Sequence, residues 1–325
     1  MSSSLPDARV TARPGLIDTL QAGFNTVNRN AWLLLLPLAI DIFLWLGPQV
    51  SMGGALDSWL RAAVPPPGSD SSLVQIFEQN RRSSLETLQQ GDGISRFNLL
   101  SLIAMPILGI PSFRFGLPGE GTLLPAGSLG SAAAVSAGVL IAGLIATAMF
   151  YGLMAQAVRD GGARPRTFID DAGRLCVAVA GLYGLIIVLT IAIGVPLYFL
   201  LVVASAAAPP AAAIVGPLFV GFLLWGLLYL FFTTEALFIG RVSPILAMQQ
   251  SIVVVRGYFW PTLGFIALYL VISIGMATLW QEIARNLRGV GTIVAIVGHI
   301  YISSGLAAAS MTYYRERSEQ LRSHA

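Results

Sequence analysis

The sequence predicts an all-α integral membrane protein, a polytopic bundle of about six transmembrane helices with cytoplasmic amphipathic helices and one re-entrant or interfacial segment. Three observations predict this fold class. Of the 325 residues, 55% are hydrophobic and only 11% are charged, whereas a soluble domain carries about 25% charged residues. The mean hydropathy is +0.75. Six stretches are apolar over the roughly 20 residues that a helix needs to cross a hydrocarbon core of about 30 Å.

The sequence marks some of these spans more clearly than others. The fifth is the clearest, because Trp260 and Trp280 lie twenty residues apart. That spacing puts the two rings about 30 Å apart on a helix, at the two headgroup boundaries that tryptophan prefers. The third span is too long for a straight crossing, and Pro196 predicts a kink because it cannot donate to the carbonyl of Ala192. The predicted membrane domain covers 31–313, with spans at about 31–50, 133–157, 175–205, 211–239, 259–281 and 289–313.

The second span is rich in small residues, which let helix backbones approach closely. Gly138, Ala142 and Ala146 follow one another at intervals of four on one face. Gly143 and Thr147 repeat that spacing on the neighbouring face. We predict that these residues pack against another helix, although an alanine-rich helix also produces such spacing by chance.

The distribution of arginine predicts the topology. A further apolar run, 99–113, is short and is interrupted by Pro106 and Pro111. If it does not cross, twelve arginines share one side with both termini, and only Arg285 and Arg288 lie in the short loops opposite. This is a strong positive-inside signal. We therefore predict that the run is re-entrant or interfacial, and that both termini are cytoplasmic in a bacterial inner membrane. The twelve are Arg9, Arg13, Arg29, Arg159, Arg164, Arg166, Arg174, Arg241, Arg256, Arg315, Arg317 and Arg322.

The remaining segments follow from this topology. Residues 1–30 form a cytoplasmic amphipathic N-terminal segment, 51–132 form one outer connection, and 314–325 form a cytoplasmic tail. Within the outer connection, apolar residues recur at helical spacing from Leu73 to Leu88, and the opposite face carries charges of both signs. This pattern predicts a helix. Its mixed charge favours a cap on the bundle over a helix that lies flat on the membrane.

Three segments share one plan, in which an amphipathic stretch precedes a span. They are Leu16–Asn30, Arg166–Arg174 and Pro244–Tyr258. Such self-similarity suggests the duplication of a hairpin unit. Amphipathic helices also precede many spans without duplication, so both interpretations stay open.

Two segments, 231–268 and 23–37, carry motifs that cover about a quarter of the chain. The motif residues are Gly23-Phe24, Asn28-Arg29-Asn30, Pro37, Glu235, Ser243-Pro244, Ala247, Ser251 and Arg256-Gly257-Tyr258-Phe259-Trp260. They resemble bacterial six-span membrane proteins related to the membrane domain of some glycerophosphoryl diester phosphodiesterases. In those enzymes the catalytic residues belong to a separate soluble barrel, which has no counterpart here. The resemblance implies a six-helix membrane fold and no catalytic residue.

Three ionisable residues fall inside predicted spans: Asp41, Glu235 and His299. A charged group at the bilayer centre costs about 2.5–3.5 kcal/mol on insertion scales, so each needs a partner or a purpose. Asp41 and His299 are both predicted near mid-depth, where a hydrogen bond between them would be structural, or would form part of a proton or ion relay. Glu235 is predicted near the cytoplasmic boundary, as an ion pair with Arg241, a helix cap, or a charged gate.

The sequence lacks the common catalytic motifs: a His-Glu-x-x-His zinc site, a phosphate loop and a Gly-x-Ser-x-Gly elbow. Cys176 is the only cysteine, which excludes an internal disulfide and a cysteine metal site. Asp160, Asp170 and Asp171 offer ligands for a divalent cation, but a charged helix start explains them better. No cofactor, metal or nucleic-acid partner is predicted.

These observations favour a non-enzymatic membrane protein, a structural or accessory subunit or scaffold whose partners are membrane lipids and other membrane-protein subunits. The alternative is a transporter or channel for a small or lipidic substrate, which would use Asp41 and His299 at mid-depth. A third hypothesis, a lipid-modifying enzyme, would use the loop from Asp160 to Asp171.

Overall fold

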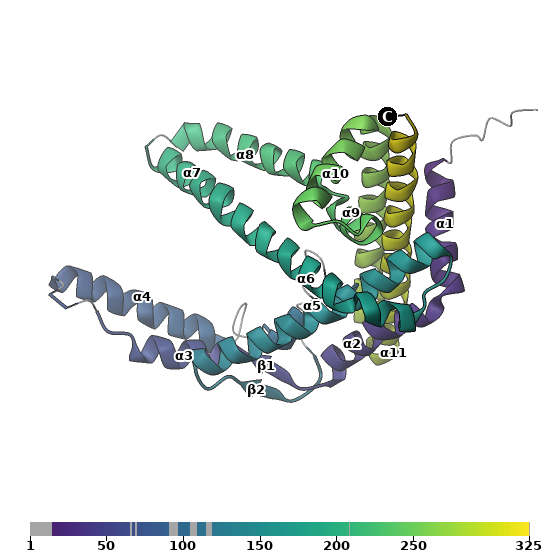
Figure 1. Cartoon of the computed structure of the whole chain (residues 1–325). Coiled ribbons are helices and arrows are strands. Elements are labelled where there is room, and N and C mark those ends of the chain that lie inside the picture. Colours follow the sequence, from purple (N-terminus) through teal and green to yellow (C-terminus); the bar gives the residue numbers. More distant parts are fainter. Residues whose placement is uncertain are drawn as a thin grey trace, which may run out of the picture.

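The structure is a computed structural model that describes residues 15–65, 67–68, 70–90, 97–104, 109–114, 119–207 and 209–324. Within these ranges almost every element is a helix, which confirms the predicted all-α polytopic fold (Figure 1). The elements in chain order are α1 (Leu16–Arg29), the 3-10 helix η1 (Ala31–Leu34), α2 (Leu35–Leu46), β1 (Gln49–Ser51), α3 (Gly53–Ala62), α4 (Ser71–Gln90), the 3-10 helix η3 (Leu99–Ala104), β2 (Leu123–Pro125), α5 (Leu129–Asp160), α6 (Pro165–Leu189), the π-helix η4 (Thr190–Gly194), α7 (Val195–Ala207), α8 (Pro209–Leu230), α9 (Thr233–Gly240), α10 (Pro244–Gly257) and α11 (Phe259–His324).

Within the described ranges, five helical stretches are long and apolar enough to cross a membrane, and a bent pair near the N-terminus makes a sixth if it counts as one span. The chain is therefore a multi-pass membrane protein, as its composition predicts. The five stretches are Leu129–Asp160, Phe168–Ser205, Ala213–Gly240, Phe259–Leu287 and Gly289–Ser323.

The first predicted span is shorter than expected. The chain bends by 85° between α1 and the helix that follows. That second helix has four residues in η1 and twelve in α2, about 26 Å at 2.0 Å per 3-10 residue and 1.5 Å per α-helical residue. It ends at Leu46 because Pro48 cannot continue the helical hydrogen bonding, and Gly47 caps it by donating its N–H to the carbonyl of Phe43 at 2.8 Å.

The last two predicted spans are the two arms of α11. The arms follow each other directly, as Phe259–Leu287 and Gly289–Ser323, and the chain folds back on itself between them. A Cβ added to Gly298 would lie 2.5 Å from the ring of Trp280, and the hydroxyls of Thr262 and Tyr313 are 3.2 Å apart. The reversal lies just before Gly291, where an added Cβ would lie 2.4 Å from the carbonyl oxygen of Ile283.

The third and fourth spans are both irregular. The π-helical turn η4 ends two residues before Pro196, and such a wider turn accommodates a proline that cannot make the usual backbone hydrogen bond. The irregularity predicted at Pro196 therefore takes the form of a π-helical turn. The fourth span breaks at Phe231 and Phe232, between α8 and α9.

The core lies where α1, α9 and α10 meet the second arm of α11. The ring of Tyr313 stacks on Phe265 and Phe232, with centroids 4.5 and 5.4 Å away. On the other side of this arm, Gly23 brings α1 into close contact, since an added Cβ would lie 2.4 Å from the backbone nitrogen of Ala309. Figure 1 shows α1 and α10 running along this C-terminal arm, whereas the α7–α8 hairpin extends away from it.

Only part of the predicted small-residue face of α5 is buried. Gly143, Ala146 and Thr147 are buried, but Gly138 and Ala142 are exposed. The expectation that all of them pack against a helix is therefore wrong for Gly138 and Ala142. The reason is that the buried face of α5 contacts η3, and a Cβ on Gly143 would lie 2.7 Å from a carbonyl oxygen of that segment.

The outer connection is anchored at its ends. β1 and β2 pair in parallel, with Gln49 opposite Leu123, and the side chain of Asn98 accepts the N–H groups of Val50 and Leu100, each at 3.1 Å. The amphipathic stretch forms α4 as predicted, but α4 packs against α3 and extends away from the bundle (Figure 1). Its predicted role as a cap on the bundle is therefore wrong.

Candidate functional site

Asp41 holds a non-helical segment against α2. Its carboxylate is buried and accepts hydrogen bonds from the Ser112 hydroxyl, from the N–H of Phe113 at 2.8 Å and from the N–H of Arg114 at 3.4 Å. Backbone donors outside a helix need an acceptor wherever water is excluded. Asp41 supplies that acceptor, so the end of the predicted re-entrant run docks on α2 without helical structure, whereas residues 99–104 of the run form the 3-10 helix η3.

His299 lies on the opposite side of the same segment. Its ring is 5.8 Å from the ring of Phe113, and Nε2 is 3.4 Å from the Ser303 hydroxyl. In the part of the chain that the structure describes, every hydrogen bond of Asp41 goes to residues 112–114. The predicted Asp41–His299 hydrogen bond is therefore wrong, because Phe113 packs between the two elements that carry them.

Glu235 lies in the first turn of α9 and faces the core. Its Oε1 accepts from the Ser310 hydroxyl at 2.6 Å, and its Oε2 is buried without a hydrogen-bond partner among the described residues. The predicted ion pair with Arg241 is wrong, since Arg241 binds Asp171 at 2.5 Å. The physical reason is helical geometry, because residues six apart are rotated by about 240° and face different sides.

Ser251 is a structural residue that the sequence indicated only within the family resemblance. Its hydroxyl donates to the carbonyl of Tyr229 at 2.7 Å and accepts the N–H of Phe232 at 3.1 Å. Ser251 thereby satisfies two backbone groups that the break between α8 and α9 exposes. The available signal was a serine among apolar residues at the same helical spacing as Ala247 and Val255, all three of which are buried.

The aspartates at the end of α5 and the start of α6 do not form one metal-binding group. Asp160 pairs with Arg159 at 3.0 Å, and Asp171 pairs with both Arg174 at 3.6 Å and Arg241. Among the residues that the structure describes, no group of three or more His, Cys, Asp or Glu side chains is arranged to hold a metal ion. Asp160 and Asp171 are thus each paired with arginine.

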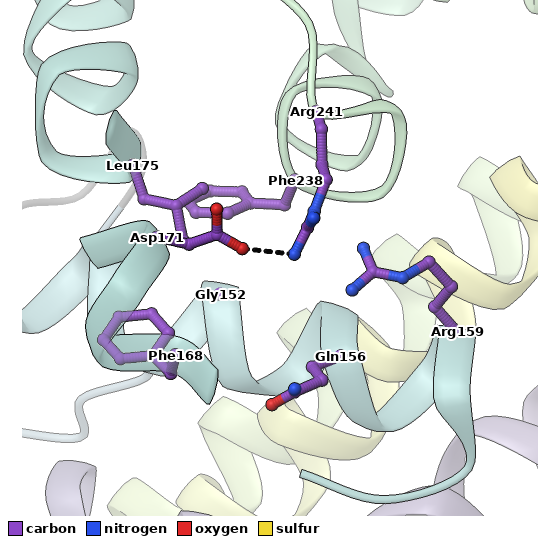
Figure 2. Close-up of a pocket in the computed structure, with 8 residues that line it drawn as sticks. All are labelled: Gly152, Gln156, Arg159, Phe168, Asp171, Leu175, Phe238 and Arg241. Atoms are coloured by element: carbon purple, nitrogen blue, oxygen red, sulfur yellow. Dashed lines mark hydrogen bonds and ion pairs between the residues drawn. The ribbon is translucent and has the colours of Figure 1, made fainter. Parts of the chain in front are cut away.

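A small pocket lies between the C-terminal end of α5, the start of α6 and the end of α9 (Figure 2). Its apolar wall consists of the buried side chains of Phe168, Leu175 and Phe238. Polar side chains form its rim, and Figure 2 shows the guanidinium groups of Arg159 and Arg241 turned toward the same space. The other lining residues are Gly152, Gln156 and Asp171.

Comparison of the chain with protein-family models, with curated proteins and with solved structures found no match. The resemblance to the membrane domain of the phosphodiesterases stays a prediction. The function is accordingly argued from the geometry of the chain itself.

Proposed function

We propose that this protein is a non-enzymatic subunit or scaffold of the bacterial inner membrane, with both termini in the cytoplasm, and that it binds another membrane protein through its α7–α8 hairpin. The observation that carries the proposal is the packing of this hairpin. Two spans contain α7 and α8, and in the most apolar part of each span no residue is buried within the chain. The two helices mainly contact each other.

The surface of the hairpin supports this proposal. Phe199 on α7 is 67% exposed and Phe222 on α8 is 58% exposed. In lipid the hydrophobic effect does not bring helices together, so association depends on close packing of side chains. Two long helices that leave the core of their own chain offer a large surface for such packing.

The intramembrane polar groups support a structural protein over a transporter. Asp41 is occupied by a backbone segment, and Glu235 accepts a hydrogen bond from a neighbouring helix. The pocket of Figure 2 lies beside Arg241 rather than beside Asp41 or His299. Transport along Asp41 and His299 would need a polar cavity that reaches both.

Duplication of a hairpin unit also belongs to the proposal. α1 and α10 both have 14 residues. They end at residues of nearly the same conformation, Asn30 (φ −126°, ψ 42°) and Tyr258 (φ −132°, ψ 47°). The middle segment, Arg166–Arg174, differs because its helix α6 continues without a break to Leu189. This likeness supports a relation between the first and last units.

The test is purification of the tagged full chain in a mild detergent, followed by cross-linking. We expect a complex of fixed stoichiometry that is lost when Phe199 and Phe222 are both replaced by alanine. Replacement of Trp260, an exposed aromatic residue on α11, is the matched control and should leave the complex intact. A solitary monomer, or a complex that survives the hairpin substitutions, would contradict the proposal. Reporter fusions at both ends test the orientation.

A further inference from the structure

We infer that the pocket of Figure 2 binds the phosphate of an anionic phospholipid headgroup, with Arg159 and Arg241 as its ligands. The two arginines come from different elements, the last turn of α5 and the residue that follows α9. Their guanidinium groups nevertheless turn toward one space (Figure 2). Guanidinium groups bind phosphate oxygens through paired, charge-assisted hydrogen bonds.

The charge around the pocket favours an anion. Three arginines (Arg159, Arg174 and Arg241) and two aspartates (Asp160 and Asp171) make up the ion pairs in and beside this pocket, so their net charge is 3 − 2 = +1. Asp171 bridges Arg174 and Arg241, and Asp160 holds Arg159. Neither carboxylate bridges Arg159 to Arg241, and an anion between these two guanidinium groups would relieve their mutual repulsion.

The backbone conformation of Arg241 is a second, independent indication that its side chain takes part in binding. Among the described residues it is the only non-glycine residue with a positive φ, at 52°. It occupies the C-cap of α9, a position where glycine avoids the strain that a Cβ causes. Strained residues of this kind cluster at binding sites, where the surrounding structure holds them in place.

The position of the pocket selects a lipid as the source of the phosphate. The two spans that flank it end at Asp160 and Gly240, so its rim lies where these helices leave the apolar region. Lipid phosphates lie at that level of a bilayer, and basic pockets between helices bind anionic headgroups there. The apolar wall of Phe168, Leu175 and Phe238 lowers the local dielectric, which strengthens the attraction.

The experiment uses the full chain in detergent and measures the shift in unfolding temperature as phosphatidylglycerol is added. We expect Arg159→Gln and Arg241→Gly each to raise the lipid concentration for half of the shift about tenfold, the effect of losing one charge-assisted hydrogen-bonding group. Arg241→Gly places a glycine where the backbone favours one, so the variant should be at least as stable as the parent without lipid. Arg285→Gln is the matched control, because Arg285 is 72% exposed and pairs with Glu282 far from the pocket.

Three outcomes would overturn the inference. The first is an equal response of all three variants to phosphatidylglycerol. The second is an equal shift with zwitterionic phosphatidylcholine, which would show that the site does not select an anionic lipid. The third is an arginine-dependent shift of the same size with inorganic phosphate alone, which would assign the pocket to free phosphate instead.

Discussion

Replacement of Asp41 by alanine should destabilise the protein more than the loss of any other carboxylate except Glu235. The change removes the acceptor for three donors on residues 112–114 and leaves their backbone in an apolar environment. The segment would then detach from α2, and Phe113, which belongs to one buried apolar cluster with Trp45 and Ile300, would lose its position.

The magnitude follows from the three hydrogen bonds. The N–H of Phe113 makes a short bond at 2.8 Å, and an unpaired buried donor costs about 1–3 kcal/mol. The bond from Arg114, at 3.4 Å, is long and therefore weak, and the Ser112 hydroxyl can rotate toward another acceptor. The expected loss is about 2–5 kcal/mol, a large share of the roughly 5–15 kcal/mol that keeps a domain folded. Asp41→Asn keeps one acceptor oxygen and should cost about half as much.

The assay is unfolding of the purified protein in mixed micelles as the fraction of denaturing detergent rises, followed by tryptophan fluorescence. Asp57→Asn is the matched control. Asp57 accepts a hydrogen bond from Arg61 at 2.8 Å on the surface of α3, which lowers the pKa of its carboxyl below the ordinary value. An exposed pair of this kind contributes little to stability. Equal midpoints for Asp41→Ala, Asp57→Asn and the parent would refute the reasoning.

Four further substitutions test the packing. Gly143→Ala should lower stability by about 1–3 kcal/mol through overpacking, while Gly138→Ala, at an exposed helical position, should be neutral or slightly stabilising in the same assay. Ser251→Ala should lower the free energy of unfolding by about 2–4 kcal/mol, because it leaves a buried carbonyl and a buried N–H without a hydrogen-bond partner. Amide exchange at the break after α8 should become faster, and unchanged exchange would contradict this explanation. Gly291→Leu should block the reversal of α11, so a disulfide engineered between its two arms should form in the parent and fail in the variant.

The membrane architecture could be predicted from the sequence because the constraint is local. A helix in lipid satisfies its own backbone hydrogen bonds and must be apolar over about 20 residues, and both properties are visible in a short window. For the same reason α4 was predictable as a helix from its periodicity, and Pro196 marked an irregular turn.

The partners of the polar residues were not predictable, because each depends on a segment far away in the chain. Asp41 meets Ser112, 71 residues later, and Glu235 meets Ser310, 75 residues later. The sequence indicated that Asp41 needs a hydrogen-bond partner at mid-depth. It did not indicate whether that partner is a histidine in the last span or a backbone segment in the outer connection.

Burial of the small residues illustrates the same limit. Gly138 and Gly143 occupy one helix and have the same composition around them, yet only Gly143 is buried. The sequence alone determined that lipid surrounds this chain and which of its stretches are helical, since solvent and backbone hydrogen bonding act on each segment separately. The tertiary structure alone decided which donor reaches which acceptor and which face is buried, since these contacts join segments that only the folded chain brings together.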